Sequence, residues 1–279
     1  MTRERSRFAG GDQTYLREQQ YRDPSRLAKR ADLHRLYSTA TVPWFEWVAG
    51  WFEIDAGASV LEVGCGPGWM WEQSAHRLPG GVDLTLSDLS PGMVDVAVDR
   101  ARATEHFRSV TGHHGDAQAL PFDAEQFDLV IANHMLYHLP DPAAGVAELA
   151  RVVRRSGSVV VATNGQHHLR ELKRIDHEVF GVAPIDAIVE AFGAESGFPL
   201  LRRGFGDVSW HQYIDAIRCD DPAAVLDYLC SAPPGEDATP EELVRLRAAI
   251  DAAIASDGGA MTITKDTGCF VCRRPVERA

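Results

Sequence analysis

The strongest constraint on the fold is a short apolar strand that runs directly into three glycines at alternate positions. Residues 60–68 are Val-Leu-Glu-Val-Gly-Cys-Gly-Pro-Gly, and the apolar spacing after them predicts a helix over 70–78. Glycine is used where the backbone turns tightly or approaches a ligand closely. A glycine turn after a first parallel strand also lies where open α/β sheets bind ligands, beyond the strand carboxyl ends. The segment therefore predicts an α/β sheet with a ligand site at this turn.

The glycine spacing separates this turn from two other ligand-binding turns. In the dinucleotide fingerprint GxGxxG the third glycine comes later, whereas here it is Gly68, and Trp69 stands at the fingerprint position. The Gly-Lys-Ser/Thr ending of a phosphate-binding P-loop is missing as well. The spacing thus disfavours a nicotinamide-dependent oxidoreductase.

Strand and helix patterns alternate over residues 59–163, which implies βαβ units and a parallel sheet. The expected strands are 59–63, 82–87, 106–114, 127–132 and 158–163, and the expected helices are 70–78, 91–104 and 143–153. The later part predicts helices at 166–180, 184–196, 222–229 and 240–255, and strands at 208–217 and 261–273. We expect the last two strands to pair antiparallel. The predicted fold class is α/β: a Rossmann-like, doubly wound, mostly parallel seven-stranded sheet with an antiparallel edge hairpin and a helical lid.

The chain divides by pattern into three segments. Residues 1–54 form an N-terminal helical lid segment, with one helical pattern over 14–52; residues 55–165 form the α/β core; residues 166–279 form a helical substrate cap and the last two strands. Trp44, Trp47 and Trp51 fall on one helical face, which predicts a stripe in the core or the pocket wall.

The core motifs resemble those of the class I methyltransferases that use S-adenosylmethionine (SAM). The first motif of that family is (Glu/Asp)-x-Gly-x-Gly-x-Gly, and Glu62, Gly64, Gly66 and Gly68 fill it completely. The most similar subgroup is that of ubiquinone and menaquinone biosynthesis, with its small-molecule relatives. The resemblance implies SAM as the cofactor and these four residues as part of its site.

Further family positions follow in the same order. Asp88 matches the acid that binds the ribose hydroxyls, and Met93 matches the apolar residue that packs on the adenine. Asp116 matches the acid that bonds the adenine amino group, with Ala117 beside it. Asn133, after the fourth strand, matches the position near the methionine end of the cofactor. The resemblance implies that all five residues bind SAM.

Methyl transfer from a sulfonium is an in-line displacement, so a catalytic base is optional. His134 and His138 follow the fourth strand and are the candidate bases, because imidazole accepts a proton near neutral pH. The alternative is that they pack beside the cofactor or stabilise a loop. Tyr21 is a candidate cover of the cofactor methyl group, by resemblance, or a packing residue. For His168 and its neighbour His167 we expect surface or helix-cap roles rather than substrate contacts.

No metal site is predicted. His134 and His138 have metal-ligand spacing, but Met135 replaces the Glu of HExxH. Cys269 and Cys272 form a CxxC on a predicted strand, where residues three apart point to opposite faces. The five cysteines and the absence of a secretion signal argue against a disulfide framework.

Net charge and hydropathy indicate which classes of binding partner are expected. The net charge of −12 disfavours nucleic acid, and no apolar stretch approaches a membrane span or a signal peptide, so we expect a cytoplasmic protein without membrane contact. Residues 1–36 nevertheless carry nine basic and five acidic residues. This excess is either a solvated helix face or a positive rim over a pocket for an acidic ligand.

The resulting hypothesis is a SAM-dependent methyltransferase that acts on O, N or C of a small molecule in specialised or cofactor biosynthesis, as a monomer or homodimer. The alternative hypothesis is a SAM-binding cyclase or isomerase that does not transfer the methyl group. A regulatory SAM sensor is disfavoured, because a sensor needs no substrate cap.

Overall fold

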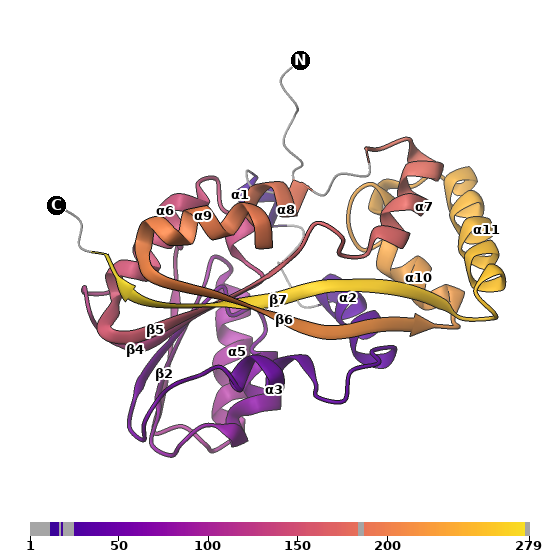
Figure 1. Cartoon of the computed structure of the whole chain (residues 1–279). Coiled ribbons are helices and arrows are strands. Elements are labelled where there is room, and N and C mark those ends of the chain that lie inside the picture. The colour runs from indigo at the N-terminus through magenta and orange to yellow at the C-terminus, as the bar shows by residue number, and fades with distance from the viewer. Residues whose placement is uncertain (1–11, 17, 19–24, 184–186, 277–279) are drawn as a thin grey trace.

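A seven-stranded sheet forms the centre of the molecule, in the order β3-β2-β1-β4-β5-β7-β6 (Figure 1). The computed structural model describes residues 12–16, 18, 25–183 and 187–276. The strands are β1 (Ser59–Val63), β2 (Asp83–Asp88), β3 (Ser109–His114), β4 (Phe127–Asn133), β5 (Val153–Asn164), β6 (Phe205–Cys219) and β7 (Met261–Pro275). β1 to β5 pair in parallel, and β7 runs antiparallel to both β5 and β6. The predicted fold class is confirmed.

The two faces of the sheet are covered by different helices because side chains alternate along each strand. On one face, Val60, Ile131 and Val160 pack with α3 (Trp44–Ala49), α4 (Trp69–Ser74) and α5 (Pro91–Ala103). On the other face, Leu61, Val130 and Val161 pack with α6 (Pro142–Val152), α8 (Ala187–Phe192) and α9 (Ala194–Gly204). Doubly wound helices on both faces leave the strand carboxyl ends as the open edge.

Cys269 and Cys272 show the same alternation. Cys269 belongs to the core on the α3–α5 face, and Cys272 belongs to the core on the α6–α9 face. Both thiols are buried and free. The prediction that this CxxC does not converge on one point is confirmed.

The β6–β7 hairpin is longer than the sheet that it closes. β6 pairs with β7 from Phe205 to Cys219, whereas β5 pairs with β7 only as far as Asn164 opposite Thr267. Figure 1 shows the hairpin running on toward α2 (Ser25–Leu36), α10 (Pro222–Leu229) and α11 (Pro240–Ser256). These helices and α7 (Arg170–Phe180) share an apolar cluster on the extension, which includes Leu33, Ile217, Ile250 and Ile263. The N-terminal helix and the C-terminal cap thus meet on the far half of the hairpin.

The prediction of one helical pattern over 14–52 is wrong. The described part contains α1 (Gln13–Tyr15), α2 and α3, and the chain between α2 and α3 bridges to β6 through Ser38 and Ile217. Asp215 of β6 accepts hydrogen bonds from the amides of Thr39 and Ala40, at 3.0 and 2.9 Å. Because these amides donate to a side chain of a distant strand, they cannot donate to the carbonyls of a continuous helix.

Other boundaries also differ from those expected. The helix expected over 184–196 is two helices, because Gly193 adopts an extended conformation between α8 and α9, and α9 continues to Gly204. β5 begins at Val153, five residues earlier than expected, because Arg154 and its neighbours continue the strand instead of forming a turn. The starts expected at Pro222 and Pro240 are confirmed, with Asp221 and Thr239 as N-caps. The division of the chain at 54 and 165 stays a prediction.

Candidate functional site: a cofactor cradle and its lid

All three glycines after β1 adopt left-handed backbone conformations, with φ of 68° at Gly64, 52° at Gly66 and 76° at Gly68. A Cβ at Gly64 would lie 2.6 Å from Met135 Cβ, and one at Gly68 would lie 2.8 Å from Ala97 Cα. A Cβ at Gly66 would meet only Leu27 Cδ2 of α2, at 3.8 Å. The outer two glycines are therefore required by their neighbours. Gly66 instead leaves an open backbone surface beneath the lid helix.

Asp88 ties the end of β2 to this turn. Its carboxylate accepts hydrogen bonds from the amides of Gly66 and Ser90, both at 2.9 Å. Burial raises the pKa of Asp88, although these amide bonds oppose the shift. A carboxylate offers about four lone-pair positions, so at least one remains after these bonds and the weaker interaction with the Leu89 amide. The side chain can therefore hold the turn and still accept from a ligand hydroxyl.

Glu62 has a partner that was not expected from the sequence. The carboxyl group is buried, and Trp71 Nε1 of α4 donates to it at 2.6 Å. Burial raises the pKa of Glu62 to about 8, so the group is mostly protonated at neutral pH. The contact fastens α4 to β1 directly behind the glycine turn. A contact between Glu62 and the cofactor stays a prediction.

Asp116 lies after β3 and is already hydrogen-bonded within the chain. Gln13 Nε2 of α1 donates to it at 3.0 Å, and the amide of Gln118 donates at 2.9 Å. Partial burial raises the pKa of Asp116, but these bonds outweigh burial and the net shift is downward. The bond from Gln13 shows that the N-terminal segment reaches the residues after β3, and the sequence motifs did not single out Gln13 for this contact.

Asn133 ends β4 with one polar atom unused. Its Nδ2 lies 3.3 Å from Met70 Sδ, whereas its buried Oδ1 has no hydrogen-bond partner among the described residues. Buried acceptors are nearly always paired, so this oxygen fits a ligand that brings a donor. Met93, which is buried, and Ala117 supply apolar surface at the same edge.

These positions fit SAM. The open glycine backbone, the spare carboxylate position of Asp88 and the unpaired oxygen of Asn133 lie at the carboxyl ends of β1, β2 and β4, as the switch-point rule requires. The end of β2 is also joined to the segment after β3, because the amide of Gly115 donates to the backbone carbonyl of Asp88 at 3.0 Å. Tyr21 lies outside the described residues.

The two candidate bases occupy different surroundings. The His134 ring lies 5.2 Å from Trp44 of α3, and its backbone has a left-handed φ of 51°. Burial and the charge of Lys265 lower the pKa of His134 to about 4. The His138 ring instead packs on Tyr137 at 4.5 Å, beside the core of the α6–α9 face. The catalytic role of either residue stays a prediction.

The tryptophan stripe packs against the edge strand. Trp44 and Trp47 each lie 5.1 Å from the ring of Tyr213 of β6, and Trp51 stacks on His211 at 3.6 Å. This confirms the expected packing role. Within the described ranges, His, Cys, Asp and Glu side chains form no group of three that could hold a metal ion.

A polar cluster beneath α2 was missed by sequence reasoning. His34 of α2 stacks on His168 with ring centroids 5.8 Å apart, and Lys265 Nζ of β7 lies 2.5 Å from Asp215 Oδ2. The surface role expected for His168 is wrong, since it is buried, whereas His167 is exposed as expected. The available signal was Lys265 itself, which falls on the apolar side of the strand that begins with Met261 and Ile263.

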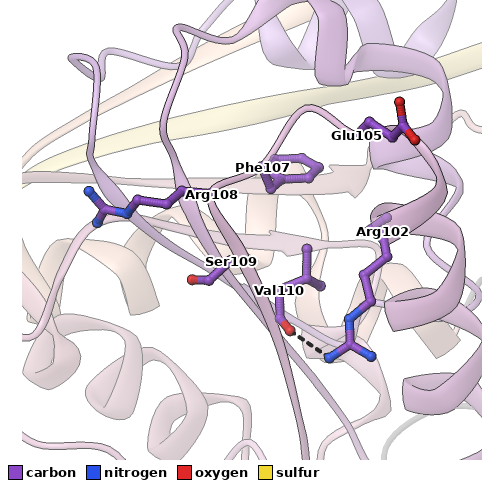
Figure 2. Close-up of a pocket in the computed structure, with 7 residues that line it drawn as sticks. Arg102, Glu105, Phe107, Arg108, Ser109 and Val110 are labelled. Carbon is purple, nitrogen blue, oxygen red and sulfur yellow. Dashed lines mark hydrogen bonds between the residues drawn. The ribbon is translucent and has the colours of Figure 1, made fainter.

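One surface hollow lies away from this edge. It encloses about 290 Å³ beside the start of β3 (Figure 2). Its polar side chains are occupied, since Arg102 donates to Val110 O at 3.0 Å and Arg108 pairs with Asp83. The hollow lies at the amino ends of the strands, opposite the glycine turn, and we assign it no function.

Comparison with known proteins gives the family. A family model described as a methyltransferase domain matches residues 61–161. The chain is 34% identical over 210 residues to a ubiquinone biosynthesis O-methyltransferase of Aromatoleum aromaticum, which covers 70% of this chain and 77% of that protein. It is 39% identical over 117 residues to a malonyl-acyl-carrier-protein O-methyltransferase of Salmonella typhimurium, covering 42% and 43% of the two chains.

Solved structures share the fold. A phosphoethanolamine N-methyltransferase of Haemonchus contortus in complex with SAM has a TM-score of 0.59 at 16% identity, covering 95% of this chain and 60% of that chain. The cyclase SpnF has a TM-score of 0.51 at 19% identity, covering 84% and 81%. Fold and site define a SAM-binding α/β enzyme. The chain belongs to the class I SAM-dependent methyltransferases, and within them it is similar to the quinone-biosynthesis type.

No helix in the described part of the chain has the length and apolar character needed to cross a membrane.

Proposed function

We propose that this enzyme transfers the methyl group of SAM to an oxygen, nitrogen or carbon atom of a small molecule in specialised or cofactor biosynthesis. The observation that carries the proposal is the unpaired Oδ1 of Asn133 at the end of β4, at the same edge of the sheet as the open backbone of Gly66 after β1. Two relatives named as O-methyltransferases favour oxygen as the acceptor atom. The net charge of −12 supports an acceptor other than nucleic acid. We also propose a cytoplasmic location.

Each candidate residue contacts a different part of the cofactor. Asp88 accepts from the ribose hydroxyls, Asp116 accepts from the adenine amino group, and Met93 and Ala117 pack on the adenine. Asn133 accepts from the ammonium group at the methionine end. The glycine turn with Glu62 behind it forms the wall, and Tyr21 belongs to the lid. When bound, SAM supplies an electrophilic methyl group for in-line displacement.

His134 is the better placed of the two candidate bases. It follows Asn133 directly and contacts Trp44 under the lid. Its low pKa keeps the imidazole neutral at physiological pH, so a nitrogen lone pair can accept a hydrogen bond from the proton-bearing group of the acceptor. His138, packed on Tyr137, is the alternative base.

Product mass tests the function. The purified enzyme is incubated with SAM and candidate acceptors, and the products are analysed by mass spectrometry. The expected product exceeds its acceptor by the mass of one methylene group, with S-adenosylhomocysteine (SAH) formed in equal amount. A product of unchanged mass, formed without SAH, would instead identify a cyclase or isomerase and overturn the proposal.

A further inference from the structure

Four nitrogen-bearing side chains gather under α2. His34 comes from α2, His168 from the β5–α7 connection, Lys265 from β7 and His134 from the end of β4. The rings of His34 and His168 are stacked with an interplanar angle of 7°. The charge of Lys265 lowers the pKa of both imidazoles, and His134 lies close enough to interact electrostatically with each of them. Four separate parts of the chain therefore contribute to one cluster, which we call the imidazole cluster.

Backbone hydrogen bonds hold the imidazole cluster in place. The amides of Gly165 and Leu169 donate to Asp266 O and Thr264 O, both at 2.8 Å, so the loop that carries His168 is fixed on both sides of Lys265. On the opposite side, the amide of Arg218 donates to Tyr37 O at 2.8 Å, which fixes the end of α2 on β6. The cluster is thus a preorganised arrangement.

His168 has an unused polar atom. The residue is 6% exposed, and its Nδ1 has no hydrogen-bond partner among the described residues. Buried polar atoms are nearly always paired with protein, water or a ligand. A neutral imidazole carries one N–H and can place it on either nitrogen, so Nδ1 can donate to an acceptor that arrives with a ligand.

The surroundings of His168 are positive. Burial lowers the pKa of His168 well below its usual value, and the neighbouring cations Lys173 and Lys265 lower it further. Arg30 lies one turn before His34 on α2, and its charge lowers the pKa of His34. The nearby acid, Asp215, is occupied by Lys265, by Ser38 Oγ at 2.8 Å and by the Thr39 and Ala40 amides. The Lys265–Asp215 pair is neutral as a whole, so the positive sign comes from Lys173 and Arg30, and it favours an anion.

Two aromatic rings connect Lys265 to His134 within the imidazole cluster. Lys265 Nζ lies 5.2 Å from the Tyr213 ring centroid, Tyr213 lies 5.1 Å from Trp44, and Trp44 lies 5.2 Å from His134. Trp44 and Tyr213 pack edge to face, with an interplanar angle of 77°, and together they offer a continuous apolar surface. A molecule with an apolar body and one charged end matches this sequence of surfaces.

We propose that the methyl acceptor is an organic anion whose carboxylate binds at the Nδ1 edge of His168, near His34 and Lys265, with its apolar body along Tyr213 and Trp44 toward His134. This inference rests on the proposed function and adds the chemical class of the acceptor. His168 Nδ1 donates to the carboxylate, and the positive surroundings of His168 stabilise its charge.

The test uses matched acids and amides. Benzoate, 4-hydroxybenzoate and hexanoate are compared with benzamide, 4-hydroxybenzamide and hexanamide, by calorimetric titration of the full chain saturated with SAH. At least one acid is expected to bind about tenfold or more tightly than its amide, because a hydrogen bond to a charged group is worth more than one to a neutral group. Binding of no acid, or equal binding of acids and amides, overturns the proposal.

Variants assign the effect to the cluster. His168→Phe is expected to weaken acid binding about tenfold to a hundredfold and to leave amide binding unchanged. His168→Asn is expected to retain the acid preference, because its amide nitrogen can replace Nδ1. His76→Phe changes an exposed histidine far from the cluster and serves as the control. Unchanged acid affinity in His168→Phe contradicts the proposal. If that variant does not fold, His34→Phe carries the same test.

The outcome is separable from the proposed function. A wild-type protein that does not bind SAH, or products without added methyl groups, would refute methyl transfer itself. Normal SAH binding and methyl transfer to neutral acceptors only would refute the carboxylate site and leave the methyltransferase function intact.

Discussion

The glycine turn allows cofactor binding to be separated from stability by two single substitutions. Gly64→Ala places a Cβ 2.6 Å from Met135 Cβ at a φ of 68°. The left-handed conformation costs about 1–2 kcal/mol for alanine, and overpacking adds about 1–3 kcal/mol. We therefore expect Gly64→Ala to lose about 2–5 kcal/mol of unfolding free energy.

Gly66→Ala should behave differently. Its φ of 52° carries a similar backbone cost, but the added Cβ meets only Leu27 Cδ2 at 3.8 Å. The expected loss of unfolding free energy is therefore only about 1–2 kcal/mol. The new methyl group would nevertheless lie on the open backbone surface assigned to the cofactor. SAH affinity should therefore fall about tenfold or more, as each 1.4 kcal/mol of lost binding energy is a factor of about ten.

Urea denaturation and calorimetric titration with SAH measure the two quantities on the same proteins. Gly80→Ala is the matched control, because a Cβ there meets no atom within 4 Å and its φ is not left-handed. Gly66→Ala with SAH affinity equal to that of the wild type would refute the assignment of the cradle. Equal stabilities of Gly64→Ala and Gly66→Ala would refute the steric reasoning.

Three further predictions concern titratable side chains. Asp88→Ala should weaken SAH binding about tenfold or more in calorimetry, whereas Asp83→Ala, at the exposed start of the same strand, should not; equal affinities would contradict the ribose contact. Because the folded pKa of Glu62 is about 8, above its unfolded value, its stabilising contribution is complete below the unfolded pKa and is lost as pH rises through about 8. Urea unfolding between pH 5 and 9 should thus show a stability decline that Glu62→Gln lacks; identical profiles would argue against a buried protonated carboxyl. Replacing His134 by Gln should lower kcat about a hundredfold without changing SAH affinity, and the reverse dependence on His138 in steady-state assays would transfer the base role to that residue.

Much of the sheet could be predicted because its information is local. The strand around Val60 and the strand around Val130 are short apolar runs bounded by turns, and Gly64, Gly66 and Gly68 need φ values that only glycine adopts readily. The antiparallel pairing of the last two strands also followed from the order of elements. These features depend on residues close together in the chain.

The imidazole cluster could not be predicted because its contacts join distant segments. His34 and His168 are separated by 134 positions in the chain and meet only because α2 packs on the extended hairpin. The same long-range packing interrupts the expected N-terminal helix, since Asp215 of β6 takes the amides of Thr39 and Ala40. Helical periodicity indicates which face of a helix is apolar. It does not indicate that a distant strand will accept the hydrogen bonds of particular backbone amides.

The most direct test of the central claim is calorimetric titration of the wild-type chain with SAM and SAH, together with mass spectrometry of any small molecule that copurifies. The account predicts one site of micromolar affinity for each compound, and SAM or SAH in the copurified fraction. Absence of binding by both compounds in a folded protein would contradict the account, and the glycine turn would then have to serve another ligand.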